Sequence, residues 1–471
     1  MNTFIPNQNA SLTSLTLVLT PFSTMVSLSQ LPFFFFFFFF FFFFTTLCNS
    51  QHYLQLPLLH TDPFPTPSQA LSLDTHRLSL LHNRRRRSAT SPVVSGASTG
   101  SGQYFVHLRL GSPPQSLLLV ADTGSDLVWL RCSACKNCSN RSPGSAFLAR
   151  HSTTFSPYHC YDSACDLVPR PDPSPCNHTR LHSPCRYEYS YSDGSRTAGF
   201  FSRETTTLNT SSGTPAKLSD LEFGCGFDVS GPSLTGPSLG GAHGVMGLGR
   251  GPISFASQLG RRFGNKFSYC LLDYTLSPPP TSYLRIGASK SDVVSKLSFT
   301  RLLLNPLSPT FYYIGIKYVS VNGVKLPVRP SVWSLDELGN GGTVIDSGTT
   351  LTFLPEPAYR LILAAFKRSL KKLASPAQPT PGFDLCVNVS GLARARLPKL
   401  SFGLAGGSVF APPPGNYFIQ TMDRVECLAI QPVDSVSGFS VIGNLMQQGF
   451  LFEFDKDRSR LGFSRHGCAL Q

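Results

Sequence analysis

Residues 120–125, Val-Ala-Asp-Thr-Gly-Ser, decide how the rest of the sequence is interpreted. An apolar run typical of a buried strand ends here in an acid, a hydroxyl, a glycine and a second hydroxyl. A carboxylate in such a place has to be hydrogen-bonded or paired, because an isolated charge is costly to bury. Thr123 and Ser125 offer hydroxyls to Asp122, and Gly124 allows a sharp turn. Taken alone, the stretch fits a turn whose aspartate is satisfied locally.

A second copy of this pattern lies 224 residues further along the chain. Residues 341–349 read Gly-Gly-Thr-Val-Ile-Asp-Ser-Gly-Thr, so that Asp346 also follows an apolar pair and precedes a hydroxyl, a glycine and a hydroxyl. An apolar pair next to a glycine follows each copy, at 244–249 and at 441–444, and such a glycine suits a close backbone crossing. Two related halves of this kind predict an approximate two-fold axis at which the two acids meet.

The remaining pattern is that of a β-rich protein. Apolar residues alternate over residues 104–110, and a Gly-Ser-Pro-Pro turn leads into the strand before Asp122. A further strand is expected over 311–321, closed by an Asn-Gly hairpin turn. Helices are predicted over 253–259 and 356–373, the second from apolar residues along one face. We therefore expect an all-β, bilobal fold with a few short helices.

Length and charge narrow the class of protein. The 471 residues are enough for two sizeable lobes. The formal net charge is +14, although only 14% of residues are charged. A basic balance can indicate nucleic-acid binding, but no dense basic stripe with interleaved aromatics follows residue 100. The one basic run, Arg84 to Arg87, lies in a segment that we expect to be removed, so a nucleic-acid partner is not expected.

The N-terminal hundred residues divide into two parts. Residues 1–48 carry no Lys, Arg, Asp or Glu and include twelve consecutive phenylalanines. They are interpreted as a signal peptide, with a retained anchor, an organellar targeting segment or a misread start as alternatives. Residues 49–100 are polar and proline-rich, and fit either a disordered linker or a propeptide whose basic residues cover an acidic cleft. We expect an N-terminal lobe over 101–298 and a C-terminal lobe over 299–471.

Cysteines and glycosylation sequons favour the secretory route. Cys48 lies in the apolar N-terminal region, and twelve cysteines follow it, an even number that suits disulfides in an oxidising compartment. The Cys-x2-Cys-x2-Cys spacing at 132–138 also fits zinc, but the even count favours disulfides, and no metal is expected. A secreted, cell-wall location is predicted, with the vacuole or a plastid as alternatives. The disulfide candidates are Cys132, Cys135, Cys138, Cys160, Cys165, Cys176, Cys185, Cys225, Cys270, Cys386, Cys427 and Cys468, and the glycosylation candidates are Asn137, Asn140, Asn177, Asn209 and Asn388.

With these motifs the sequence resembles the pepsin-like aspartic proteases, and most closely their plant nepenthesin-type branch. The resemblance runs from about Gly102 to Cys468. It rests on the two aspartate loops, on the two glycine crossings and on Tyr-Ser-Asp-Gly-Ser at 191–195, which would be the tip of a hairpin flap. The cysteine-rich segment between the first aspartate and this hairpin marks the nepenthesin-type branch.

The resemblance implies roles for residues of both loops. Asp122 and Asp346 would be the catalytic pair. Ser125 and Thr349 would hydrogen-bond the outer carboxylate oxygens, and Gly124 and Gly348 belong to the same support. Thr123 and Ser347 would lock the two loops to each other.

The resemblance also implies a substrate-binding flap and pockets. Tyr191 would close over the substrate, with Trp129 as its hydrogen-bond support. Val120 and Val344 would line apolar pockets beside the scissile bond. Typical pepsins have Gly-Thr where this flap has Ser-Asp, so an acid at the tip should favour basic or polar substrate side chains. The remaining flap candidates are Asp193, Gly194 and Ser195.

The resemblance implies an aspartic endopeptidase that acts on protein or peptide substrates at acidic pH. One carboxylate would take a proton from water while the other protonates the carbonyl, so no cofactor is needed. We expect a monomer without stable membrane association after processing. The alternative is a non-catalytic inhibitor or binding protein on the same scaffold, as in plant cell-wall proteins that block microbial glycosidases. The presence of both aspartate loops, the flap tyrosine and the supporting hydroxyls favours the enzyme.

Overall fold

The computed structural model describes most of the chain after residue 102 and three short pieces before it. The predicted signal region 1–48, the flap tip 191–194 and Cys138 lie outside the described residues. The described residues are 53–60, 70–71, 74, 103–133, 135, 146–171, 176, 182–190, 195–209, 215–231, 234, 241–273, 282–287, 296–371, 375–377, 380–391, 396–433 and 438–470.

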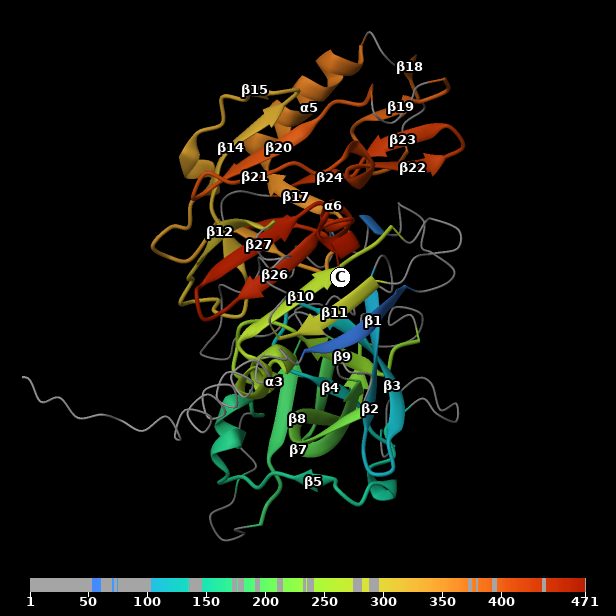
Figure 1. Cartoon of the computed structure of the whole chain (residues 1–471), viewed down its shortest axis with the longest axis vertical. Helices are drawn as coiled ribbons and strands as arrows, with labels where there is room; N and C mark the ends of the chain where they lie inside the picture. The colour runs from blue at the N-terminus through green and yellow to red at the C-terminus, as the bar shows by residue number, and fades with distance from the viewer. Residues whose placement is uncertain are drawn as a thin grey trace, which may run out of the picture. The chain divides into compact units, whose positions relative to one another are not determined.

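Strands dominate the fold, as the sequence predicts. The described strands form one sheet of nineteen strands and two sheets of four strands. In Figure 1 the strands of the N-terminal lobe, coloured cyan to green, gather apart from the orange and red strands of the C-terminal lobe. This arrangement confirms an all-β, bilobal architecture. The described α-helices are α3 (Phe255–Phe263), α5 (Glu356–Leu370) and α6 (Asn444–Gln447).

The N-terminal lobe carries Asp122 at the end of a central strand. Strand β3 pairs antiparallel with β2 and parallel with β9, and Asp122 lies opposite Gly247. Tyr104, Val106, Leu108 and Leu110 of β2 are buried, as the alternation predicts, but Phe105 on the opposite face is buried as well, in the cluster that contains Val120. The strands of this lobe are β2 (Tyr104–Leu110), β3 (Gln115–Asp122), β4 (Trp129–Arg131), β5 (Ser156–Pro157), β6 (Arg186–Ser190), β7 (Arg196–Asn209), β8 (Pro215–Ser230) and β9 (Gly244–Gly247).

The C-terminal lobe repeats this arrangement around Asp346. Strand β16 ends one residue before Asp346 and pairs parallel with β25, with Ile345 opposite Ile442. The strands of this lobe are β13 (Tyr313–Ile314), β14 (Ile316–Val321), β15 (Val324–Lys325), β16 (Thr343–Ile345), β17 (Thr352–Pro355), β18 (Ser375–Pro376), β19 (Cys386–Asn388), β20 (Leu400–Leu404), β21 (Val409–Phe410), β22 (Phe418–Met422), β23 (Val425–Leu428), β24 (Ile430–Val433) and β25 (Ser440–Ile442).

Six antiparallel strands, one from the segment before residue 101 and five from the two lobes, run side by side in the order β1–β11–β10–β26–β27–β12. Aromatic rings fill one face of this ribbon, where Phe267 stacks on Phe454 with 4.5 Å between ring centroids. Residues 54–60 form its first strand, so the disordered-linker alternative is wrong for this part of 49–100. The six strands are β1 (Leu54–His60), β10 (Lys266–Cys270), β11 (Ser282–Ile286), β12 (Ser298–Leu303), β26 (Leu451–Asp455) and β27 (Arg460–Ser464).

The two glycine crossings bring backbones into contact beside the aspartate loops. A Cβ atom at Gly244 would lie 2.0 Å from the carbonyl oxygen of Trp129, and one at Gly443 would lie 2.0 Å from the carbonyl oxygen of Leu351. Real Cβ contacts do not reach such distances, so only glycine fits at either position. The close approach predicted from the sequence is confirmed in both lobes.

Local signals set the helix and turn boundaries. Helix α3 begins two residues later than predicted, because Ser254 is its N-cap and accepts a hydrogen bond from the Ser257 N–H. Asn322 and Gly323 both have positive φ, 50° and 80°, as expected of the predicted two-residue hairpin turn. Among the described residues, none of the helices is both long enough and apolar enough to cross a membrane.

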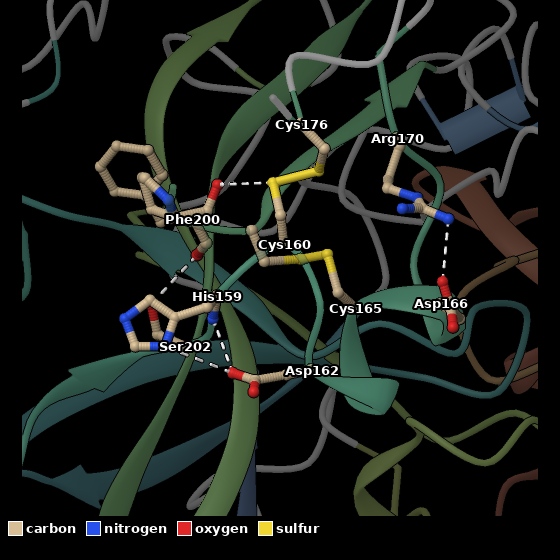
Figure 2. Close-up of a disulfide and its surroundings, with 11 residues drawn as sticks. His159, Cys160, Asp162, Cys165, Asp166, Arg170, Cys176, Phe200 and Ser202 are labelled. Carbon is tan, nitrogen blue, oxygen red and sulfur yellow. Dashed lines mark hydrogen bonds and ion pairs between the residues drawn. A yellow bond between two sulfur atoms is a disulfide. The ribbon is translucent and has the colours of Figure 1, made fainter. Parts of the chain in front are cut away.

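The described cysteines after residue 100 are all disulfide-bonded, as the sequence predicts. Figure 2 shows Cys160 bonded to Cys176, with Cys165 close by. Cys135 is also disulfide-bonded. Because Cys132 is bonded to Cys225, it is not a zinc ligand. The five described pairs are Cys132–Cys225, Cys160–Cys176, Cys165–Cys185, Cys270–Cys468 and Cys386–Cys427.

Two predicted glycosylation sequons can be placed in the fold. Asn209 and Asn388 are both exposed, as an acceptor asparagine has to be. Asn137, Asn140 and Asn177 lie outside the described residues.

Candidate active site

The first aspartate loop fixes both oxygens of one carboxylate. The backbone N–H of Gly124 donates to Oδ1 of Asp122 over 3.0 Å, and the Ser125 hydroxyl donates to Oδ2 over 2.6 Å. Asp122 is fully buried. These two hydrogen bonds hold the carboxylate in one orientation.

The second aspartate loop has the same hydrogen bonds. The backbone N–H of Gly348 donates to Oδ1 of Asp346 over 2.9 Å, and the Thr349 hydroxyl donates to Oδ2 over 2.7 Å. Asp346 is also buried. The distances in the two loops agree within 0.1 Å, so both carboxylates are held in the same way.

Reciprocal hydrogen bonds join the two loops. The Ser347 N–H donates to the Thr123 hydroxyl over 2.9 Å, and the Thr123 N–H donates to the Ser347 hydroxyl over 3.1 Å. The Ser347 hydroxyl in turn donates to the carbonyl of Ala121 over 3.0 Å. These bonds span more than 220 residues of sequence and bring the two aspartate loops together between the lobes.

A third carboxylate, which the sequence analysis did not single out, supports the first loop. Asp126 accepts a hydrogen bond from the Gly251 N–H and another from the Thr310 hydroxyl, each over 2.7 Å. Gly251 follows the first glycine crossing, and Thr310 precedes the C-terminal lobe strands. Asp126 therefore ties the first loop to a second loop of its own lobe and to the other half of the chain.

The buried amide side chain of Gln447 supports the second loop. The Gln447 amide nitrogen donates to the carbonyls of Asp346, over 3.2 Å, and Ile442, over 2.8 Å. The Tyr269 hydroxyl donates to the Gln447 side-chain oxygen over 2.5 Å. Burial raises the pKa of Tyr269 well above its usual value, and the charge of Asp346 raises it further. Tyr269 therefore stays a neutral donor.

The predicted pocket residues are buried in separate apolar clusters of the two lobes. Val120 belongs to a cluster with Trp129, and Val344 belongs to one with Tyr313. The Trp129 indole nitrogen has no hydrogen-bond partner among the described residues. Its predicted partner Tyr191 lies outside them, so the flap contact stays a prediction.

The flap candidates are only partly described. Asp193 and Gly194 lie outside the described residues with Tyr191, whereas Ser195 is fully buried at the start of β7. Gly231 packs against Ser195, since a Cβ there would lie 2.3 Å from the Ser195 Cα. Ser195 is therefore packed inside the protein where the chain leaves the predicted flap tip and enters β7.

Comparisons with known proteins agree with this geometry. A family model described as the N-terminal part of xylanase inhibitors matches residues 104–288, and one described as their C-terminal part matches residues 311–465. Aspartyl protease family protein 2 of Arabidopsis thaliana is 39% identical over 390 residues, which cover 82% of this chain and 76% of the relative. Aspartic proteinase nepenthesin-2 of Nepenthes gracilis is 33% identical over 392 residues, covering 82% and 84%.

Solved structures agree at the level of the fold. The crystal structure of edgp superimposes with a TM-score of 0.67 at 21% identity, covering 89% of this chain and 96% of the other. Basic 7S globulin from soybean gives a TM-score of 0.63 at 18% identity, covering 88% and 96%. The paired aspartate loops and the relatives above 30% identity identify the family as well as the fold. The chain belongs to the pepsin-like aspartic protease family, in its plant nepenthesin-type branch.

Proposed function

We propose that this chain is an aspartic endopeptidase that hydrolyses peptide bonds at acidic pH. The observation that carries the proposal is the pair of matched loops. In each loop, one carboxylate oxygen accepts from a glycine N–H and the other from a hydroxyl, at 2.6–3.0 Å. Carboxylates held in this way are oriented before a substrate arrives, which lowers the cost of reaching the transition state.

Water attack follows from the pairing of the two acids. Two neighbouring carboxylates do not both ionise readily, and aspartic proteases are the standard example of such a pair. With one proton between Asp122 and Asp346, the ionised carboxylate removes a proton from a bound water as its oxygen attacks the substrate carbonyl. The protonated carboxyl gives its proton to the carbonyl oxygen, which forms a tetrahedral diol.

Collapse of this intermediate completes the reaction. The carboxyl that received the water proton now donates a proton to the amide nitrogen, and the C–N bond breaks. The other carboxylate takes a proton back from a diol hydroxyl as the new carboxylic acid forms. The pair ends with one shared proton, as it began, so neither a metal nor a covalent intermediate is required.

The proposal also covers the substrate class, the oligomeric state and the cellular location of the protein. The substrates would be proteins or peptides, in line with the protease names of the relatives. The protein would be a secreted monomer after removal of residues before about 100, and the disulfides suit an oxidising compartment. The acid at the predicted flap tip, Asp193, favours basic or polar substrate side chains near the scissile bond.

A non-catalytic binding protein is the second candidate. The match to family models described as xylanase inhibitors favours it. Against it stand Asp122, Asp346 and both hydroxyl donors, because a pure binding function has no need of two oriented, buried carboxylates.

A peptidase assay on the processed chain tests the proposal. We expect cleavage of a denatured protein at about pH 3–5, inhibited by pepstatin and absent from the Asp122→Ala variant. Cleavage that survives both treatments would remove the proposed mechanism. A folded, processed wild-type chain that cleaves nothing would favour the binding protein.

A further inference from the structure

A cavity of about 740 Å³ lies against strands β6, β7 and β8 of the N-terminal lobe, and the proposed chemistry does not use it. Glu188 of β6 and Ala198 of β7 stand opposite each other in the pairing and both line the cavity. Successive side chains of a strand point to opposite faces. Tyr189, which follows Glu188, is buried in the cluster that contains Val120 and Trp129. The cavity therefore lies on the face of this hairpin that is turned away from that cluster.

A β-bulge gives the cavity an aromatic floor. The pairing of β7 with β8 shifts between Ala198 and Gly199, so that Phe227 has no residue opposite it and lines the cavity. The Phe227 ring packs edge-on against the Phe200 ring, with 5.0 Å between centroids. A Cβ at Gly199 would lie 1.9 Å from a carbonyl oxygen of β8, so no larger residue fits there. Small residues thus leave space beside two aromatic rings.

The walls of the cavity come from the cysteine-rich segment and are held in place. Phe155, just before β5, lines the cavity and packs against the main core cluster, and Pro157 of β5 lies beside it in the lining. Pro171 lines another part. The nearby Pro169 carbonyl accepts a hydrogen bond from the Glu188 N–H over 2.9 Å, which holds this stretch next to β6. The apolar walls are therefore in place before any ligand binds.

Charges in the lining do not balance. Arg196 lies between two carboxylates and forms an ion pair with each, with Glu188 over 3.3 Å and with Asp228. Arg150 and Arg186 also line the cavity, and neither forms an ion pair with any described residue. Three arginines against two acids leave a net charge of +1 in the lining. A ligand with one negative charge would restore the balance.

We propose that this cavity binds a small aryl carboxylate, with its ring against Phe200 and Phe227 and its carboxylate at Arg186 and Arg150. Guanidinium groups match carboxylates in shape and charge, and aromatic rings favour other aromatic rings as neighbours. The Arg186 guanidinium lies over the Phe200 ring, 5.8 Å from its centroid, so the cation and the aromatic floor are within reach of one small ligand. The cavity volume is that of a site for one such molecule. This inference does not rest on the proposed function.

Calorimetric titration of the full chain with two matched aromatic compounds tests the ligand class. 2-Naphthoate carries a ring system and a carboxylate, which is ionised at about pH 6, whereas 2-naphthalenemethanol has the same rings without the charge. We expect saturable binding of 2-naphthoate with a Kd below about 1 mM, and binding of 2-naphthalenemethanol at least tenfold weaker. Equal affinity for the two compounds, or no saturable binding of 2-naphthoate, would overturn the proposal.

Removal of the two arginines tests the place of the carboxylate. Both side chains are exposed, so we expect the double variant Arg150→Gln/Arg186→Gln to fold. It should bind 2-naphthoate at least tenfold more weakly than wild type and 2-naphthalenemethanol equally well, a difference that a general loss of structure would not produce. Arg360→Gln is the control, because the Arg360 side chain on α5 is 74% exposed. Unchanged binding of 2-naphthoate to the double variant would overturn the site.

Filling the cavity tests the place of the ring. Ala198→Leu adds a larger side chain to the floor, and we expect it to weaken the binding of both compounds at least tenfold. Ala216→Leu makes the same change at a partly exposed position of β8 outside the cavity, and should bind both compounds as wild type does. Wild-type affinity in a folded Ala198→Leu variant would place the ligand elsewhere and overturn the proposal. If Ala198→Leu does not fold, the arginine variant still decides the question.

Two further titrations separate this site from the proposed active site. We expect 2-naphthoate to bind equally well to the Asp122→Ala variant and to the processed chain with pepstatin present. Displacement of 2-naphthoate by pepstatin would place it at the aspartate pair and overturn the proposal. If 2-naphthoate binds as expected but the processed chain cleaves no protein, the proposed function fails while this binding site stands.

Discussion

The two aspartate loops have the same inner hydrogen bonds and different outer supports. The first loop is braced by Asp126, four residues after its own aspartate, and by the backbone bond from the Leu248 N–H to the Asp122 carbonyl over 2.8 Å. The second loop is braced by the Gln447 amide behind it and by Asp74 from the N-terminal segment. The inner bonds meet the demands of the chemistry, which are equal for both acids. The outer supports, which do not take part in the chemistry, differ between the two loops.

Replacing either catalytic carboxylate should have the largest effect on kcat. The two variants together test whether both loops contribute equally to catalysis. We expect Asp122→Asn and Asp346→Asn each to lower kcat by at least about 10³-fold, because each removes one member of an acid–base pair. The double variant should be no worse than either single one, since the pair acts as a unit. Steady-state kinetics on the processed chain measure this. Full additivity would mean that the two acids work independently.

The next effect concerns the support of the second loop. Gln447→Leu keeps the volume but leaves the Asp346 carbonyl and the Tyr269 hydroxyl without their buried partner. We expect it to lower the free energy of unfolding by about 3 kcal/mol. Gln420→Leu, at an exposed position of β22, should change it little. Denaturant unfolding measures both, and equal values for the two variants would remove Gln447 from the support.

Loss of the Asp126 support of the first loop should lower the free energy of unfolding less than loss of Gln447 does. Asp126→Asn removes the charge that holds the Gly251 N–H and the Thr310 hydroxyl, and Asp126 is partly exposed. We expect a loss of about 2 kcal/mol in the free energy of unfolding, with Asp423→Asn as the exposed control. A loss larger than that of Gln447→Leu would reverse the order that the comparison predicts.

The smallest effect should come from the outer hydroxyls. Ser125→Ala and Thr349→Ala each remove one donor from a carboxylate that keeps its glycine N–H. We expect each to lower kcat/KM about tenfold, equivalent to about 1.4 kcal/mol. Ser125→Thr and Thr349→Ser keep the hydroxyl and should retain most of the activity. Loss in only one of the two loops would show that the carboxylates are not equivalent.

The features that repeat within the chain were predictable from sequence. The aspartate loops, their hydroxyls and the glycine crossings are short local patterns that occur twice, and the positive φ angles at Asn322 and Gly323 follow from their residue types. Each of these is set by neighbours in the sequence, which is why a single sequence reveals them.

The features that differ between the halves were not predictable. Nothing near Asp74 or Gln447 in sequence indicates a carbonyl or amide partner more than 100 residues away. An even count of cysteines predicts disulfides but not that Cys270 pairs with Cys468 across 198 residues. The helical pattern places the start of α3 two residues too early, because Ser254 is the cap of the helix and not part of it. Partners of this kind are fixed by the tertiary fold and leave no local pattern.

The pH dependence of kcat/KM for the processed chain, measured on an unfolded protein substrate, tests the central claim most directly. If Asp122 and Asp346 share one proton across matched loops, the profile is bell-shaped, with both limbs below about pH 6, and vanishes in both asparagine variants. Activity that keeps rising through neutral pH, or that survives either variant, would contradict a shared-proton pair and with it the functional equivalence of the two loops.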